Sequence, residues 1–166
     1  MKLQRVLQYA QQLLIDSIQE GDTVVDATAG NGHDTLFLAQ LVGDNGQVYA
    51  FDVQKNAVDA TLLRLLDNAL EHRALVLHTG HENIAKHVKK PVAAAIFNLG
   101  YLPGSDHDIV TKPNTTILAI QDLLQLLKIG GLIVLVIYHG HPGGKEERDA
   151  VIDYVSQLPQ KYIHVL

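Results

Sequence analysis

Apolar positions along the chain alternate between a helical spacing and short unbroken runs. Apolar residues three and four apart predict helices at residues 3–18, 33–42, 55–70, 82–88, 115–127 and 145–158. Unbroken apolar runs predict strands at residues 23–27, 47–52, 74–78, 92–98 and 130–139, and residues 162–166 are predicted to begin a sixth strand. The run at 130–139 is apolar on both faces, so we expect it in the middle of a sheet.

Strands that alternate with helices are typical of α/β proteins with a mostly parallel sheet and helices on both faces. The chain contains no repeat, linker or low-complexity segment, so residues 1–166 are predicted to form one domain. The first helix is predicted to bury one stripe, and the helix at 55–70 another. These stripes are Leu3, Val6, Leu7, Ala10, Leu13, Leu14 and Ile18, and then Val58, Leu62, Leu65, Leu66 and Ala69.

Ligands of such sheets bind beyond the carboxyl ends of the strands, near the point where the strand order reverses. Four predicted strand ends carry polar residues or glycines that a plain crossover would not need. These ends are Asp26 with the loop through Gly32, then Asp52, then Asn98 with its loop, and finally Tyr138 with residues 139–144. We therefore predict a ligand site at this edge of the sheet.

The carboxylate of Asp26 narrows the choice of ligand. Dinucleotide sites place a pyrophosphate at the start of the following helix, where a carboxylate would repel it. Asp26 instead suits a ligand with a cationic group, such as S-adenosylmethionine with its ammonium and sulfonium. Asp52 lies 26 residues later, where a carboxylate can accept hydrogen bonds from ribose hydroxyls. The alternatives are that Asp26 and Asp52 only cap the helices that follow them.

Composition narrows the class of protein but not its substrate. With 47% hydrophobic and 19% charged residues the chain suits a folded globular protein, and the absence of cysteine excludes disulfides and thiolate metal sites. Polar residues interrupt every long apolar run, so neither a signal peptide nor a membrane span is predicted and a cytoplasmic location is expected. The formal charge of −5 argues against a broad phosphate-binding face but leaves a local one open.

Three segments resemble a known family: DATAGNGHDTLFLA at 26–39, FNLGYLPGSDH at 97–107 and YHGHPGGKEE at 138–147. They are similar to the small bacterial Rossmann-like methyltransferases first labelled rRNA methylases and now linked to methylation of the wobble uridine of tRNA. The resemblance runs over essentially the whole chain. It implies a class I methyltransferase fold, a three-layer sandwich, with S-adenosylmethionine as the cofactor and the anticodon region of tRNA as the partner.

By this resemblance, two groups of residues are expected to bind the cofactor, with Asn98 beside them. The loop for the methionine part is Asp26, Thr28, Gly30, Asn31, Gly32, His33, Asp34 and Thr35, and the nucleoside part is matched by Asp52, Gln54, His81 and Glu82. Thr28 stands where the usual motif has its first glycine. Residues 80–83 could equally be only the cap of a short helix.

The implied acceptor is the primary amine of 5-aminomethyl-(2-thio)uridine, which becomes 5-methylaminomethyl-(2-thio)uridine. Such an alkylamine has a pKa of about 10 and attacks only as the free base, so the site must position it and accept its proton. Asn98 and its loop are candidate acceptors for the amine hydrogens, and Tyr101 could stack on the base. His139 and His141 are candidate proton acceptors, since imidazole titrates near neutrality.

Each of these catalytic assignments has a plainer alternative. Asn98 could start a turn, Tyr101 could cover the edge of the sheet, and residues 139–144 could be only a flexible turn. Asp106 and Asp108, with the histidines at 139 and 141, also invite a metal site. Methyl transfer from a sulfonium needs no Lewis acid, however, so no metal is expected.

Three other functions share this architecture: a methyltransferase of rRNA or of a small metabolite, a dinucleotide-dependent oxidoreductase, and a nucleotide-binding domain without catalysis. Asp26 and the absence of a G-x-G-x-x-G motif argue against the oxidoreductase. Folds of this type close their sheet with a sixth and a seventh strand, whereas the sequence ends at Leu166 as the sixth begins. The last strands are therefore expected to be missing from it, and the open sheet edge favours a homodimer.

Overall fold

A computed structural model describes residues 5–89, 91–100 and 110–166 of the chain. Its sheet has five strands in the order β3-β2-β1-β4-β5, and every neighbouring pair is parallel. The strands are β1 (Thr23–Asp26), β2 (Gln47–Asp52), β3 (Ala74–His78), β4 (Val92–Leu99) and β5 (Leu127–Ile137). The helices are α1 (Val6–Ser17), α2 (His33–Val42), α3 (Lys55–Asp67), α4 (Ile84–His87), α5 (Pro113–Leu126) and α6 (Gly144–Ser156), with 3-10 turns at Glu71–Arg73 and His81–Asn83.

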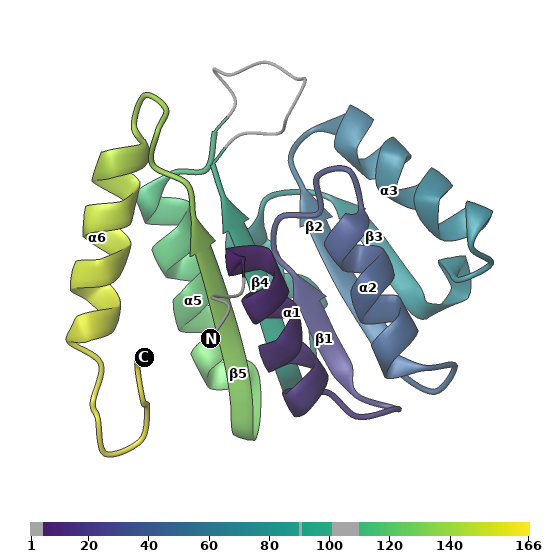
Figure 1. Cartoon of the computed structure of the whole chain (residues 1–166), viewed down its shortest axis with the longest axis horizontal. Helices are drawn as coiled ribbons and strands as arrows, with labels where there is room; N and C mark the ends of the chain where they lie inside the picture. The colour runs from purple at the N-terminus through teal and green to yellow at the C-terminus, as the bar shows by residue number, and fades with distance from the viewer. Residues whose placement is uncertain (1–4, 90, 101–109) are drawn as a thin grey trace.

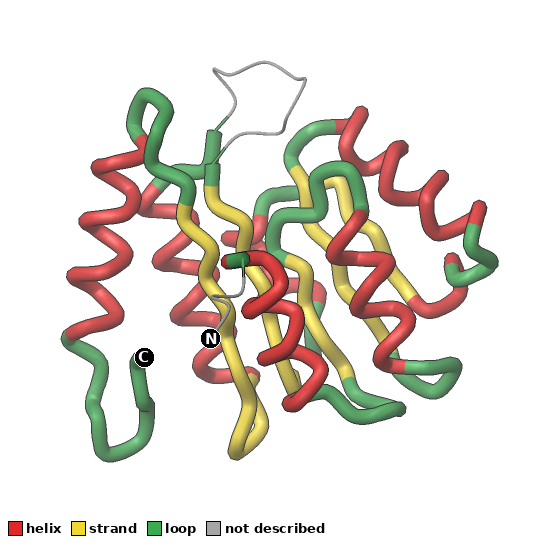
Figure 2. Tube along the Cα trace, in the orientation of Figure 1, coloured by secondary structure: helices red, strands yellow, loops and turns green. Residues whose placement is uncertain are grey.

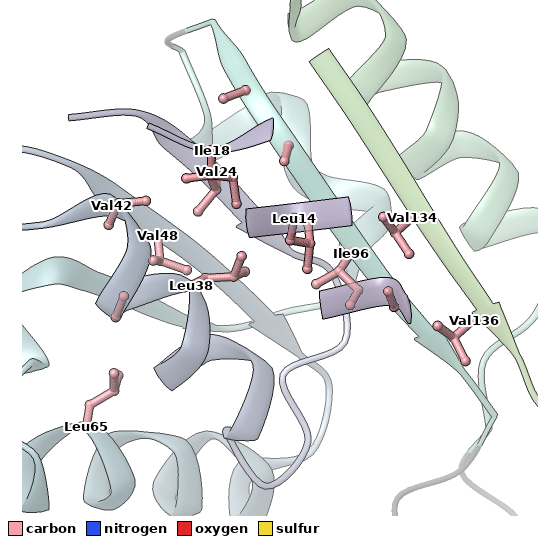
Figure 3. Packing of buried hydrophobic residues seen from close by; sticks show 14 residues of the cluster. Leu14, Ile18, Val24, Leu38, Val42, Val48, Leu65, Ile96, Val134 and Val136 are labelled. Carbon is pink, nitrogen blue, oxygen red and sulfur yellow. The ribbon is translucent and has the colours of Figure 1, made fainter. Parts of the chain in front are cut away.

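The helices form a layer on each face of the sheet (Figure 1). Side chains from α1, α2 and α3 pack on one face in a cluster that contains Leu14, Leu38 and Leu65 (Figure 3). Side chains from α4, α5 and α6 pack on the other face. In β1, Val24 belongs to the first cluster and Val25 to the second, as the alternation of side chains along a strand requires. The predicted three-layer α/β sandwich is therefore confirmed.

The predicted stripe of α3 was partly wrong. Val58 and Leu65 are buried as predicted, whereas Leu62, Leu66 and Ala69 are exposed. Ala57 and Thr61 are buried as well. The buried stripe is rotated toward Thr61, whose hydroxyl has a partner inside the protein. In α1, likewise, Val6 and Leu7 are exposed, whereas Ala10, Leu14 and Ile18 are buried.

The predicted central position of the last long strand was also wrong. β5 pairs with β4 on one side and is the edge of the described sheet. Its apolar residues on both faces reflect the helices above and below it, because α1 packs on one face and α5 on the other. Coverage of the two faces says nothing about which strands lie alongside.

The predicted sixth strand at residues 162–166 is not formed, and these residues have no regular secondary structure (Figure 2). A strand needs a neighbour for its backbone hydrogen bonds, and in the described residues none pairs with this segment. Among the described residues, no strand pairs with the outer edge of β5. An unpaired edge can pair with another chain, and the expected homodimer stays a prediction. Among the described residues, no helix is both long and apolar enough to cross a membrane.

Because all five strands are parallel, their carboxyl ends lie together at one edge of the sheet, the upper edge in Figure 1. The helix α1 runs along the sheet in the direction opposite to the strands (Figure 1). This arrangement brings the ends of β1, β2 and β4 next to each other, as the sequence pattern predicts.

Candidate active site

A cleft of about 950 Å³ opens at the carboxyl edge of the sheet. Loops after all five strands contribute to it, and Leu7 and Gln11 of α1 also line it. Eleven of the predicted site residues line this cleft: Thr28, Gly30, Asn31, His33, Asp34, Asp52, Gln54, His81, Glu82, Asn98 and His141. The predicted location of the site is thus supported by the geometry.

Asp26 lies beneath the loop after β1 and does not line the cleft. It is fully buried, and both carboxylate oxygens have partners: the Thr28 N–H donates to Oδ1 over 3.1 Å, and the Thr35 hydroxyl donates to Oδ2 over 2.6 Å. Gly32 and Thr35 are also buried outside the cleft wall. These three residues therefore shape the loop from below, and their part in cofactor binding stays a prediction.

Asp26 does not cap the following helix either. The residue before α2 is Gly32, and no side chain caps that helix. The side chain of Asp26 instead ties the first residues after β1 to the first turn of α2, through Thr28 and Thr35. The carboxylate thus fixes the path of the whole loop.

Of the two neighbouring carboxylates, Asp34 lines the cleft and Asp26 does not. Burial raises the pKa of Asp26 to about 7, and the neighbouring charge of Asp34 contributes to the rise, against the hydrogen bonds from Thr35 and Thr28. Burial also raises the pKa of Asp34, whereas His33 and Asn98 lower it. Asp26 is buried and Asp34 half-buried, and two acids this close together resist a second negative charge, so a cation in the cleft would relieve that cost.

Asn98 connects β4 to the loop after β1. Its backbone N–H donates to the Thr28 hydroxyl over 2.7 Å, and its side-chain Nδ2 donates to the carboxylate of Asp34. Its Oδ1 is buried and has no hydrogen-bond partner among the described residues. Since Asn98 lies within β4, it does not start a turn. It leaves an acceptor oxygen, next to Asp34, that a ligand donor could satisfy.

Asp52 joins the ends of β1 and β2. One carboxylate oxygen accepts the Gly30 N–H and the other accepts the Gln54 N–H, each over 2.9 Å. Gln54 is itself the residue before α3, so Asp52 is not a simple cap of that helix. The carboxylate lines the cleft with acceptor capacity left, because an ionised carboxylate has about four lone-pair sites.

Two residues of α3 that were not predicted from the sequence hold the loop between β1 and α2 in place. The Thr61 hydroxyl donates to the carbonyl of Gly30 over 3.1 Å, and Arg64 Nε donates to the carbonyl of Asn31 over 2.8 Å. Gly32 has φ +84°, and a Cβ there would lie 2.8 Å from Thr61 Cα. The loop can lie this close to α3 only with glycine at that position.

His81 sits in the 3-10 turn after β3 and is buried against the ring of Phe97, with 5.4 Å between ring centroids. Its Nδ1 lies 2.9 Å from the Ala27 carbonyl, which can only accept, so Nδ1 carries the proton. Burial lowers the pKa of His81, which favours the neutral ring. Its Nε2 is then an acceptor at the cleft wall, beside Glu82.

Of the two predicted proton acceptors after β5, only one lines the cleft. His141 lines the cleft, and its Cε1 would lie 3.5 Å from a Cβ on Gly100 and 2.8 Å from one on Gly144. His139 is exposed and does not line the cleft, so the structure does not bring it together with the other predicted site residues. The catalytic role of His139 stays a prediction. Tyr101, Asp106 and Asp108 lie outside the described residues.

The order of strands, the two helical layers and the cleft at the carboxyl edge define a Rossmann-like methyltransferase fold. Solved structures agree. The "putative rRNA-methylase" from Clostridium thermocellum superposes with a TM-score of 0.95 at 44% identity, over 97% of this chain and 87% of that one. SMU.1697c, "a putative methyltransferase" from Streptococcus mutans in complex with SAH, gives a TM-score of 0.88 at 37% identity, over 96% and 86%.

The chain belongs to the family described as "Putative rRNA methylase", whose sequence profile matches residues 48–166. The resemblance seen in the three sequence segments is thereby confirmed. Among curated proteins, the chloroplastic tRNA (mnm(5)s(2)U34)-methyltransferase of Arabidopsis thaliana is 43% identical over 153 residues. The match covers 86% of this chain and 56% of that relative, so the chain spans little more than half of its length.

The close approach of the loop to α3 predicts a large cost for Gly32→Ala. Both Gly32 and the exposed Gly21 have positive φ, of +84° and +90°, but a Cβ on Gly21 meets nothing within 4 Å. We expect Gly21→Ala to lower the free energy of unfolding by about 1–2 kcal/mol, from backbone conformation alone. Gly32→Ala should cost about 2–5 kcal/mol, because Thr61 must also move. Urea denaturation measures both, and equal losses would contradict the packing described for Gly32.

Burial of Asp26 predicts a pH dependence of stability. An ordinary aspartate carboxyl has a pKa of 3.8, whereas that of Asp26 is about 7 in the folded protein, so between these values the folded state binds more protons than the unfolded state. The stability of the wild type should therefore fall as the pH rises through this window. Asp26→Asn lacks the titration, so its unfolding free energy relative to wild type should climb from about pH 4 to about pH 7 and then level off. A pH-independent difference would show that Asp26 ionises normally.

Proposed function

We propose that the chain is an S-adenosylmethionine-dependent N-methyltransferase that acts on tRNA. Its acceptor is the primary amine of 5-aminomethyl-(2-thio)uridine at the wobble position, and its product is the 5-methylaminomethyl form. The observation that carries this proposal is the hydrogen bond between Asp34 of α2 and Asn98 of β4, which leaves Asn98 Oδ1 without a partner among the described residues. The 43% identity to a tRNA (mnm(5)s(2)U34)-methyltransferase supports the choice of acceptor.

The residues in the cleft fit this cofactor better than a dinucleotide. Among the described lining residues there are three acids, Asp34, Asp52 and Glu82, and the one Lys or Arg is Lys112. This charge balance favours a ligand with an ammonium and a sulfonium and disfavours a pyrophosphate. Asp34 and Asn98 Oδ1 would accept from the amino group, and Asp52 would accept from the ribose hydroxyls. His81 would offer its Nε2 to the amine of adenine.

When bound, S-adenosylmethionine supplies an electrophilic methyl group, whose bond to sulfur breaks as the new bond to the acceptor nitrogen forms. The protein's part is to hold the acceptor amine in line and to favour its free base, since an alkylamine with a pKa of about 10 is mostly protonated at neutral pH. His141 lines the same cleft and is the imidazole that we assign to receive the proton. Gly144 leaves the space in which its ring lies, since a Cβ there would lie 2.8 Å from His141 Cε1.

A labelled-methyl assay tests the acceptor. The wild type should transfer label to tRNA that carries 5-aminomethyl-2-thiouridine at the wobble position, and not to the same tRNA without the aminomethyl group. Label in an rRNA fragment, or in a small amine but not in the tRNA, would replace the proposed substrate. If the protein binds S-adenosylhomocysteine but transfers label to none of these acceptors, it is a cofactor-binding domain, and the proposal that it is a methyltransferase is refuted.

Calorimetry with S-adenosylhomocysteine tests the carboxylate assigned to the cofactor. Asp34→Asn should weaken binding about 10- to 100-fold, the usual range for the loss of a hydrogen bond to a charged group. Asp153→Asn is the matched control, because Asp153 is exposed on α6, and it should leave the affinity unchanged. Wild-type affinity in Asp34→Asn, or tight binding of NAD by the wild type, would contradict the assignment.

A further inference from the structure

Glu147 is a buried acid that the proposed chemistry does not use. It lies in the first turn of α6, is only 3% exposed and does not line the cleft. Its Oε1 accepts the hydroxyl of Thr111 over 2.6 Å, and its buried Oε2 has no hydrogen-bond partner among the described residues. Burial raises the pKa of Glu147, against the hydrogen bond from Thr111.

Thr111 carries this contact to the cleft. Its hydroxyl oxygen accepts the Gly100 N–H over 2.8 Å, and its own N–H donates to the Gly100 carbonyl, also over 2.8 Å. The single hydroxyl hydrogen of Thr111 therefore goes to Glu147, and the oxygen goes to Gly100. Both Gly100 and Thr111 line the cleft. A chain of three hydrogen-bonded residues thus ties α6 to the backbone that follows β4.

The position of Gly100 matters because of its neighbours. It comes two residues after Asn98, and a Cβ on it would lie 3.4 Å from Tyr138 Cβ and 3.5 Å from His141 Cε1. Any shift of Gly100 therefore changes the space in which the ring of His141 lies. A leucine at position 147 could fill the same buried site without the cost of burying a carboxylate, so packing alone does not explain the acid.

We propose that Glu147 is a positioning residue for the acceptor side of the cleft. Through the Thr111 hydroxyl it holds Gly100 in place, so that His141 keeps the position that the acceptor amine requires. Cofactor binding does not depend on this link, because Asn98 and Asp34 are held by each other and by Thr28, and Asp52 is held by Gly30 and Gln54. The proposal rests on the proposed function for its catalytic meaning, while the link itself can be tested without turnover.

Matched variants at both ends of the hydrogen bond test the proposal. Glu147→Leu and Thr111→Val remove the bond, whereas Glu147→Gln keeps an acceptor oxygen and Thr111→Ser keeps the hydroxyl. We expect kcat/KM for the aminomethyl tRNA to fall about tenfold in the first two and to stay within about twofold in the others. The affinity for S-adenosylhomocysteine should stay at the wild-type value in all four. The double variant Glu147→Leu/Thr111→Val should be no worse than Thr111→Val alone.

Three results would overturn the proposal: no loss in Glu147→Leu, a loss in Glu147→Gln as large as in Glu147→Leu, or a parallel loss of cofactor affinity. Thermal unfolding shows whether each Glu147 variant is folded. If one is not, the two Thr111 variants still test whether the hydrogen bond positions Gly100. Amide hydrogen exchange gives a readout that needs no substrate. The Gly100 amide should exchange faster in Thr111→Val and Glu147→Leu than in the wild type and Thr111→Ser.

Failure of this proposal and failure of the proposed function look different. If the wild type transfers no methyl group to the tRNA, the proposed function fails, while the exchange of the Gly100 amide still reports on the link. If transfer occurs but Gly100 exchanges at the same rate in all variants, the proposed function stands and Glu147 has no positioning role.

Discussion

The buried carboxylate of Asp26 is the interaction on which the site depends. It accepts a backbone N–H from Thr28 and a hydroxyl from Thr35, and so closes the loop between β1 and α2 from below. The Thr28 hydroxyl in turn accepts the N–H of Asn98. One buried acid therefore sets the separation of β1, α2 and β4 at the edge where the cleft opens. Its burial is costly, as the raised pKa of Asp26 shows, and a stability optimum alone would not retain it.

The same loop sets the charge that a ligand meets. With Asp26 underneath, Asp34 comes to the cleft wall and is hydrogen bonded by Asn98. Asp52 holds the N–H of Gly30, one of the groups that a pyrophosphate would need in a dinucleotide site. Thr61 and Arg64 draw the loop carbonyls toward α3. The result is a cleft rich in acceptors, which suits a cationic methyl donor and an amine.

Much of the fold could be predicted because its signals are local. The strands at 47–52 and 74–78 and the helix at 33–42 match the structure at both ends, since glycines, asparagine or charged residues mark their limits. The direction of Asp26 could not be predicted, because all four residues of β1 are buried and no polar face shows which way a side chain points. The roles of Thr61, Arg64 and Glu147 depend on contacts 31, 33 and 36 residues away in the chain. Such contacts leave no periodic trace, although a threonine inside the apolar stripe of α3 was a signal that could have been noticed.

A crystal structure of the protein with S-adenosylhomocysteine tests the central claim most directly. We expect the amino group of the ligand within hydrogen-bond distance of Asp34 and of Asn98 Oδ1, with Asp26 still beneath the loop and hydrogen bonded to Thr28 and Thr35. A ligand amino group pointing to solvent, with its carboxylate or a soaked diphosphate beside Asp34, would contradict it.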